Sequence, residues 1–392
     1  MHIFSKLLIL LIVFSIGLGF GHSTVSKDKT QNIQTIEKNI PKAFISEVYD
    51  KIKDNYWDNI SDAQLKDLFK IATQNNGGQL NEESAAKIAQ AVLSSLNPAG
   101  RSGLYTQKNE EQLKNTVNNV NPEKDLYKDL GVKKEASREA IAQAYQEKLK
   151  TEKSEEKIKQ LTYARDVLTK DDTKNRYDST QVEPTIFTKI VRPGILYLQF
   201  KKFSPTSLDE FVKAFDSYKD DSALYGLIFD LRGNVGGAID ASAYFLGNFI
   251  GKNQYAYDFY HKGEYLPFKT PTDKLPSIAK YKQIVILVDN NTQSSAEIMA
   301  SSLKKYHVGI VVGVPTKGWG TVERIFPLDN QISKTEKYSL FLVHSITLRD
   351  DNLPIEGRGV DPDVNIKDPN WQQQFLLYLN FPNLLQAVKE VL

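Results

Sequence analysis

Ser294 is the residue of this chain whose surroundings best suit nucleophilic chemistry. It follows the apolar run Val285 to Val288, and the segment Ser294 to Ile298 opens an apolar helical pattern that continues through Met299, Ala300 and Leu303. A serine at a strand-to-helix turn is exposed, and the helix N-terminus beyond it favours developing negative charge. Serine also caps helices routinely, so Ser294 alone leaves two interpretations open, a nucleophile or an N-cap.

A glycine-rich turn offers what such a nucleophile needs. The segment from Asp230 to Gly237 follows a buried-strand pattern and ends in the adjacent glycines Gly236 and Gly237. Two adjacent glycines let the backbone approach a ligand closely and point N–H groups at it, as an oxyanion site requires. Taken alone, the turn is equally typical of a tight connection between a strand and a helix.

The elements that must position these residues alternate between strand and helix. Short apolar runs predict strands at Ile195 to Phe200, Leu227 to Leu231, Ile284 to Val288, Ile310 to Val312 and Leu340 to Val343. Helical spacing over Leu208 to Tyr218 lies between the first two of them. This alternation predicts a mixed α/β sheet with helices packed on it.

Composition limits the function classes. The chain has 392 residues and is 41% hydrophobic, which predicts two or three domains. A formal net charge of +2 gives no reason to expect a nucleic-acid partner. The absence of cysteine excludes disulfides, thiolate zinc sites and a thiol nucleophile. Histidine is scarce, His261 and His344 stand singly outside the site, and we expect no cofactor and no metal.

The N-terminus is typical of export. The apolar run Leu7 to Phe20 follows Lys6 and precedes small and polar residues. Its length suits a signal peptide, although an uncleaved signal anchor is the alternative. We therefore expect an exported, extracytoplasmic or periplasmic protein, whose contact with a membrane is limited to that anchor.

Several segments together resemble the C-terminal processing (tail-specific) serine peptidases of the S41 type. They are Asp230 to Gly237, Ser294 to Ile298, Val312 to Glu323 and Gly359 to Asp363. The family motifs at these places read Asp-Leu-Arg-x-Asn-x-Gly-Gly, Ser-Ala-Ser-Glu-Ile, Val-Gly-x-Pro-Thr-x-Gly-Lys-Gly-Thr-Val-Gln and Gly-Ile-x-Pro-Asp. Upstream, Val48 to Trp57 and Ser95 to Thr106 are similar to the family's N-terminal helix pair and to its Leu-Asp-Pro-His-Ser…Tyr-Leu-Thr signature.

A separate segment, Pro122 to Asp178, is similar to a J-domain. The likeness rests on Leu130-Gly131-Val132, on Ala164 to Leu168 and on Asn175 to Asp178. Its loop at Thr151 to Ser154 lacks the His-Pro-Asp tripeptide that engages Hsp70, so we expect no Hsp70 partner. In the S41 family a PDZ domain that binds substrate C-termini usually occupies this place, so we expect the insert to have a structural or peptide-docking role.

The resemblance implies a catalytic dyad of serine and lysine. Ser294 is the nucleophile by this resemblance, and the oxyanion donors are the N–H of Ser295 and the N–H of Gly236 or Gly237. The family's lysine accepts the serine proton, and an adjacent glutamine orients that lysine.

Two of the implied positions depart from the family pattern. Trp319 stands where the lysine belongs, and Glu323 stands at the glutamine position. An indole has no basic nitrogen, so Trp319 cannot accept the serine proton. Lys317 precedes Trp319 by two residues and faces the same side of an extended segment. We therefore expect Lys317 to act as a relocated base, with Glu323 holding its ammonium group.

These observations predict a mixed α/β fold, in which an S41-type core, an α/β sandwich or open sheet, carries an N-terminal helical region and an all-α J-like insert. The expected divisions are a signal segment (1–24), a helical region (42–114), the insert (121–179), the peptidase domain (185–366) and a helical tail (367–392). Two functions remain open. One is an exported serine-type endopeptidase that cleaves protein substrates near their C-terminal regions. The other is an inactive pseudopeptidase that binds peptides or partner proteins.

Overall fold

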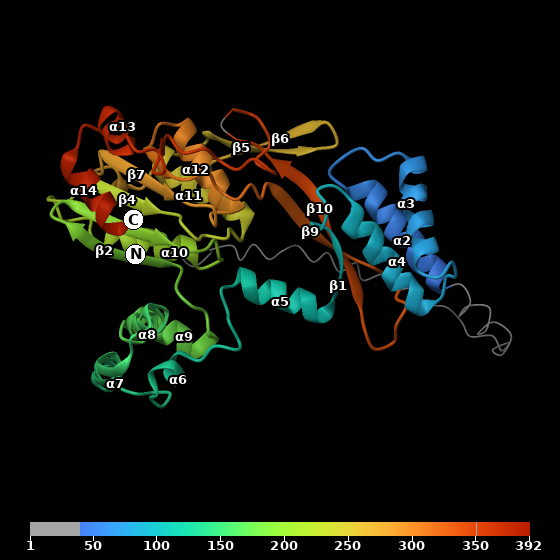
Figure 1. Cartoon of the computed structure of the whole chain (residues 1–392), viewed down its shortest axis with the longest axis horizontal. Helices are drawn as coiled ribbons and strands as arrows, with labels where there is room; N and C mark the ends of the chain where they lie inside the picture. The colour runs from blue at the N-terminus through green and yellow to red at the C-terminus, as the bar shows by residue number, and fades with distance from the viewer. Residues whose placement is uncertain (1–39, 350) are drawn as a thin grey trace, which may run out of the picture. The chain divides into compact units, whose positions relative to one another are not determined.

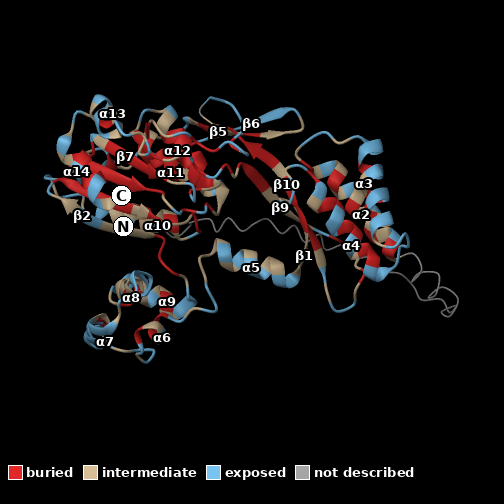
Figure 2. Cartoon of the chain, in the orientation of Figure 1, coloured by how far each residue is buried: buried red, intermediate tan, exposed pale blue. Residues whose placement is uncertain are grey.

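A largely parallel sheet carries the predicted site. This computed structural model describes residues 40–349 and 351–392, and its larger sheet runs in the order β11-β8-β7-β4-β3-β2 (Figure 1). Its strands are β2 (Ile186–Arg192), β3 (Ile195–Phe200), β4 (Gly226–Asp230), β7 (Gln283–Val288), β8 (Ile310–Gly313) and β11 (Val364–Asn365). β2 pairs antiparallel with β3, and the other neighbours pair parallel. The central strands are buried on both faces, as is usual for parallel sheets (Figure 2).

Helices cover both faces of this sheet. Leu196, Leu198 and Phe200 of β3 lie in one apolar core, whereas Ile195 and Tyr197 of the same strand lie in another. The first core includes side chains of α10 (Ser207–Asp216), α11 (Ser242–Ile250) and α12 (Ser295–Lys305), and the second includes those of α13 (Trp371–Tyr378) and α14 (Pro382–Val391). The C-terminal helices thus complete the core of the sheet.

A second, antiparallel sheet joins distant parts of the sequence. It consists of β1 (Gly103–Thr106), β5 (Tyr255–His261), β6 (Glu264–Lys269), β9 (Thr321–Pro327) and β10 (Tyr338–Thr347). β10 pairs with β1, β5 and β9, so this one strand connects the N-terminal region to the segment that contains Trp319.

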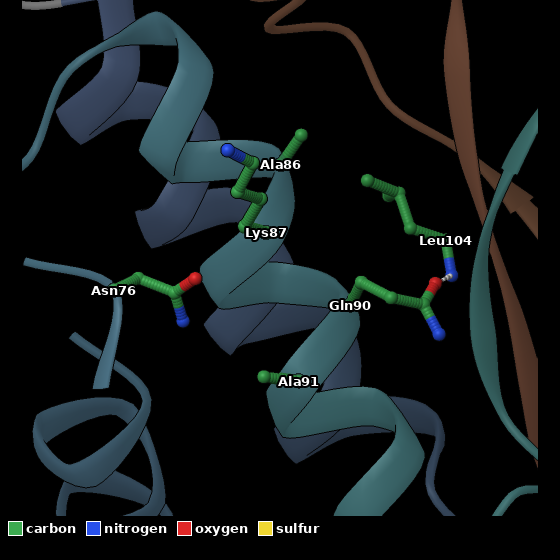
Figure 3. Close-up of a pocket in the computed structure, with 6 residues that line it drawn as sticks. All are labelled: Asn76, Ala86, Lys87, Gln90, Ala91 and Leu104. Atoms are coloured by element: carbon green, nitrogen blue, oxygen red, sulfur yellow. Dashed lines mark hydrogen bonds between the residues drawn. The ribbon is translucent and has the colours of Figure 1, made fainter.

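The region before β1 is helical. It contains α2 (Ile40–Asn55), α3 (Asp62–Asn75) and α4 (Glu82–Ser95), and α5 (Gln107–Val117) follows β1. An open pocket of about 460 Å³ lies between α4 and β1, and its lining residues are Asn76, Ala86, Lys87, Gln90, Ala91 and Leu104 (Figure 3). Within it, the N–H of Leu104 donates to Gln90 Oε1 at 2.8 Å. None of the predicted site residues lines this pocket.

The segment predicted as an insert forms a helical unit with its own core. Its helices are α6 (Leu126–Leu130), α7 (Arg138–Thr151), α8 (Glu155–Leu168) and α9 (Asp171–Thr180). Leu126, Ile141, Ala164 and Val167 are fully buried in that core. The resemblance of this unit to a J-domain remains a prediction, as do the domain limits.

The predicted mixed α/β fold is confirmed, and each predicted strand corresponds to one of β3, β4, β7, β8 and β10. The signal segment, residues 1–24, lies outside the described residues. Among the residues that are described, no helix combines the length and the apolar character that a membrane span requires.

Two histidines that stand far apart in the sequence stack on each other in the second sheet. The rings of His261 and His344 lie 4.3 Å apart at an interplanar angle of 13°. Burial, together with the positive charges of Arg324, His261 and Lys262, lowers the pKa of His344 to about 4. The folded protein therefore binds a proton at His344 more weakly than the unfolded chain does.

This shift predicts that acid destabilises the fold through His344. The pKa of a histidine is about 6.5 in an unfolded chain. The contribution of neutral His344 to the free energy of unfolding is therefore complete above about pH 6.5 and is lost as the pH falls toward 4. Solvent screens a half-buried ring, so we expect a loss of about 1 kcal/mol in unfolding free energy between pH 7 and pH 5.

Urea unfolding of the unmodified protein and of His344→Gln at both pH values measures this loss. The variant should lose about 1 kcal/mol less than the unmodified protein, because glutamine does not titrate. An identical pH dependence in the two proteins would show that His344 is not the group responsible.

Candidate active site

The site lies where two neighbouring parallel strands end. β4 and β7 lead into loops that hydrogen bonds hold together. The N–H of Gly233 donates to Asp289 Oδ1 at 2.9 Å, and the N–H of Gln293 donates to the carbonyl of Asn234 at 2.8 Å. The carboxyl ends of parallel strands are the usual place for a ligand site in an open α/β sheet.

Ser294 occupies a strained turn at this edge. Its backbone angles are φ +54° and ψ −124°, immediately before α12 begins. A positive φ is uncommon outside glycine, and strained serines of this kind occur at strand-to-helix turns that expose a nucleophile. The side chain is half-buried. The backbone conformation therefore favours the interpretation of Ser294 as a nucleophile over a simple N-cap, which normally has extended angles.

Glycine is required beside Ser294 because the two loops touch there. A Cβ atom at Gly236 would lie 2.7 Å from Ser294 Cβ and 3.0 Å from the backbone nitrogen of Ser295. Both distances are too short for any larger residue to fit without displacing the turn. The close approach brings the glycine loop and the nucleophile turn into direct contact.

Of the two glycines predicted as oxyanion donors, only Gly237 has its N–H available. The N–H of Gly236 donates to Asn234 Oδ1 at 2.9 Å, which corrects the prediction for that residue. Within the described residues, the N–H groups of Gly237 and Ser295 make no hydrogen bond. The hydroxyl of Ser295 donates to the carbonyl of Gly237 at 3.3 Å and so links the two donors. Two unpaired N–H groups beside a serine, one of them at a helix N-terminus, suit a developing oxyanion.

Glu297 fixes the position of the nucleophile turn, and the sequence predictions missed this role. Its fully buried carboxylate accepts the N–H of Ser294 at 2.8 Å, the N–H of Trp319 at 2.8 Å and the N–H of Gly318 at 2.7 Å. It also accepts the hydroxyl of Thr316 at 2.5 Å. Burial raises the pKa of Glu297, and these four donors oppose that rise. The Ser-x-x-Glu spacing, typical of a capping box, was the signal that could have identified it.

Trp319 lies between a cation and a carboxylate. Arg101 Cζ lies 3.4 Å from the centroid of the indole ring, and the indole N–H donates to Glu323 Oε1 at 3.4 Å. Thr321 Oγ1 donates to the same oxygen at 2.5 Å. Burial raises the pKa of Glu323, while its two donors and the charge of Arg101 oppose the rise. The indole is therefore held in place by cation–π and hydrogen-bond contacts.

Arg101 belongs to the site although no sequence pattern pointed to it. Its Nε and Nη2 donate to Glu356 Oε1 at 3.3 Å and 3.0 Å, and Glu356 Oε2 accepts the N–H of Gly320 at 2.8 Å. The guanidinium is therefore oriented over Trp319 by a carboxylate 255 residues away in the chain. A guanidinium cannot be deprotonated in a protein, so Arg101 is no substitute for the missing base.

Lys317 lies beside the nucleophile turn with its side chain exposed. Its backbone N–H donates to the carbonyl of Thr292 at 3.0 Å, two residues before Ser294. Within residues 40–349 and 351–392 its ammonium group makes no hydrogen bond or ion pair. The expectation that Glu323 holds this ammonium is wrong, because Glu323 instead accepts Trp319 and Thr321.

The described site thus brings a candidate nucleophile, Ser294, beside two unpaired N–H groups, and an indole lies at the position where a base is expected. The same part of the chain contains no group of three or more His, Asp or Glu side chains suited to a metal ion. The chemistry that these residues offer is attack by Ser294 on an acyl group, provided that a proton acceptor reaches its hydroxyl.

The four hydrogen bonds at Glu297 predict that Glu297→Gln weakens the fold. The new amide group would face backbone N–H donors, so at least one buried donor would lose its partner. We expect the free energy of unfolding to fall by about 2 to 4 kcal/mol. Glu264→Gln, on the exposed strand β6, is the matched control and should change it by about 0.5 kcal/mol at most. Equal stability of the two variants in urea unfolding would contradict this role for Glu297.

Comparison with known proteins identifies the family. A sequence profile of peptidase family S41 matches residues 194–366. Carboxy-terminal processing protease CtpA of Bacillus subtilis (strain 168) is 30% identical over 196 residues, which cover 50% of this chain and 39% of that protein. A carboxy-terminal-processing protease of Bartonella bacilliformis is 25% identical over 173 residues, covering 44% of this chain and 38% of that protein. The chain thus spans about two fifths of the length of these relatives.

Solved structures share the fold at low sequence identity. The photosystem II D1 C-terminal processing protease has a TM-score of 0.55 and 12% identity, covering 84% of this chain and 93% of that chain. A lipoprotein from Streptococcus agalactiae has a TM-score of 0.50 and 14% identity, covering 87% of this chain and 96% of that chain. Residues 194–366, which contain the Asp-Leu-Arg-x-Asn-x-Gly-Gly turn and the serine segment beside it, thus match peptidase family S41.

Proposed function

We propose that this chain is a serine-type endopeptidase that hydrolyses peptide bonds in protein substrates through Ser294. The observation that carries the proposal is the strained turn of Ser294 beside the unpaired N–H groups of Ser295 and Gly237. Strain of this kind persists only where the surrounding structure imposes it, and it is concentrated at functional sites. The similarity to relatives named as carboxy-terminal processing proteases also supports a peptidase function.

In the proposed reaction Lys317 acts in its neutral amine form: Ser294 Oγ attacks the scissile carbonyl carbon and gives its proton to that amine. The N–H groups of Ser295 and Gly237 stabilise the negative oxygen of the tetrahedral intermediate. The protonated amine then returns the proton to the leaving nitrogen as the peptide C–N bond breaks. In the second half, water attacks the acyl carbon and gives a proton to the amine of Lys317, which passes it to Ser294 Oγ as the ester bond breaks. The backbone of Lys317 adjoins Thr292, and its flexible four-carbon stem allows the amine to turn toward Ser294.

The proposal extends to substrate and location. We propose that the substrates are polypeptides cleaved in their C-terminal regions, in keeping with the names of the sequence relatives. An exported, extracytoplasmic location is proposed on the apolar segment Leu7 to Phe20 and rests on the sequence alone.

Hydrolysis of an unfolded protein tests the peptidase proposal. Ser294→Ala should abolish hydrolysis and remove labelling by a fluorophosphonate probe. Lys317→Ala should lower the rate by about 100-fold or more, since loss of a general base typically costs that much. Lys334→Ala, in the exposed loop between β9 and β10, is the matched control and should keep the full rate. Full activity of Lys317→Ala would remove Lys317 from the mechanism, and an unlabelled Ser294 would refute the nucleophile.

One observation favours a second candidate function, a pseudopeptidase that binds peptides or partner proteins without cleaving them. The indole of Trp319 is fixed beneath Arg101 and against Glu323 at the family's lysine position. The other site elements, including the oxyanion donors, would then hold a peptide but not activate the serine. This candidate predicts measurable peptide affinity in a protein that shows no turnover.

The double variant Trp319→Lys with Glu323→Gln separates the two candidates. The amine that it introduces lies where Arg101 supplies a nearby positive charge, which lowers the pKa of an amine and favours its action as a base. If the unmodified protein is a pseudopeptidase, the double variant should gain hydrolysis that a further Ser294→Ala change removes. Glu323→Gln alone is the control and should remain inactive. Turnover by the unmodified protein would exclude the pseudopeptidase.

A further inference from the structure

A pair of lysines leads from the sheet into the oxyanion loop. Lys201 and Lys202 follow β3 directly, and the next residue, Phe203, pairs with the glycine turn. The N–H of Phe203 donates to the carbonyl of Gly236 at 2.9 Å, and the carbonyl of Phe203 accepts the N–H of Ala238 at 2.8 Å. The two lysines are therefore joined through one residue to the loop that contacts Ser294.

The ammonium groups of both lysines lack acceptors. Lys201 Nζ lies 4.5 Å from the ring centroid of Tyr163 and 4.7 Å from that of Phe187. Both lysines are half-buried, and within the described residues neither ammonium makes a hydrogen bond or an ion pair. Burial lowers the pKa of each, and the charge of Lys124 adds to the shift at Lys201. A partly desolvated cation without an oxygen partner is unfavourable and gains from an anion.

The surrounding carboxylate is already engaged. Glu183 accepts the hydroxyl of Tyr163 and lies 3.4 Å from Lys124 Nζ, with both contacts at its Oε2 atom. Lys124 Nζ also lies 4.2 Å from the ring centroid of Tyr163. Asp166, the other acid near Lys201, accepts two donors of Arg165. The cluster of Lys124, Lys201 and Lys202 therefore has more positive charge than the acids around it balance.

We infer that Lys201 and Lys202, assisted by Lys124, bind a carboxylate group of the polypeptide that occupies the Ser294 site. The inference rests on the proposed function, since it assumes a bound polypeptide. Ammonium groups form short, strong hydrogen bonds with carboxylates, and Lys201 and Lys202 lie at the carboxyl end of β3, the edge at which α/β sheets bind ligands. An anchored carboxylate beside the oxyanion loop fixes how far from that group the chain can be cleaved.

The carboxylate can come from two sources, the C-terminus of the peptide or an acidic side chain, and binding measurements distinguish them. The full chain carrying Ser294→Ala, which cannot cleave, is titrated with a fluorescent peptide that ends in a free carboxylate. The same peptide ending in an amide is compared with it, as is the amide peptide with aspartate as its last residue. Tighter binding of the free acid alone identifies the terminal carboxylate, and tighter binding of the aspartyl amide identifies a side chain.

Lysine variants in the Ser294→Ala background test the site itself. Lys201→Met with Lys202→Met should weaken binding of the carboxylate peptide by about tenfold or more and leave the amide peptide unchanged. Lys189→Met, on the exposed part of β2, is the matched control and should bind like the parent. Lys202→Arg, which keeps the charge, should bind within about threefold of the parent. Unchanged binding of the amide peptide by the double methionine variant shows that its fold is intact.

Equal loss of acid and amide peptide, or no loss in the double variant, overturns the inference. Binding is measured without cleavage. The comparison of acid and amide peptides can therefore be interpreted even if the protein proves not to be a peptidase. A carboxylate preference that depends on the two lysines, together with no turnover by the unmodified protein, would support the site while refuting the enzyme.

Discussion

The site depends on one buried carboxylate that satisfies four donors at once. Glu297 joins the backbone of Ser294 to the backbone of Gly318 and Trp319, two segments that leave different strands of the sheet. A buried carboxylate is tolerable only when its oxygens are fully paired, and here every pairing also sets the position of a site residue. The strained conformation of Ser294 is held at its N–H by this group, so stability and site geometry share one cause.

Much of this arrangement could be predicted because its signals are local. The strand pattern before Ser294, the helix after it and the adjacent glycines all lie within short stretches of chain. Those stretches also carry the family motifs, so the fold and the turn that contains the candidate nucleophile Ser294 could be predicted from them. The choice between Gly236 and Gly237 could not, because it depends on which N–H the side chain of Asn234 accepts.

The site features that could not be predicted depend on contacts between residues far apart in the sequence. Arg101 reaches Trp319 and Glu356 only because β1 pairs with β10, which brings the N-terminal region to the edge of the site. The prediction that Lys317 pairs with Glu323 followed the alternation of an extended segment. Within the described residues Lys317 and Glu323 make no ion pair, and Glu323 Oε1 accepts the indole of Trp319 and the hydroxyl of Thr321 instead. Pairing of side chains depends on competition among donors, and sequence spacing does not reveal that competition.

The bond between Arg101 and Glu356 has a consequence for the order in which the molecule can assemble. The partners are 255 residues apart, so closing this contact orders a very long loop. During synthesis the N-terminal helices emerge before the residues of β10 on which Phe44 and Trp57 pack. The guanidinium over Trp319, however, has no carboxylate to orient it until residue 356 has been made. A nascent chain that ends before residue 356 therefore lacks the contact that orients Arg101 over Trp319.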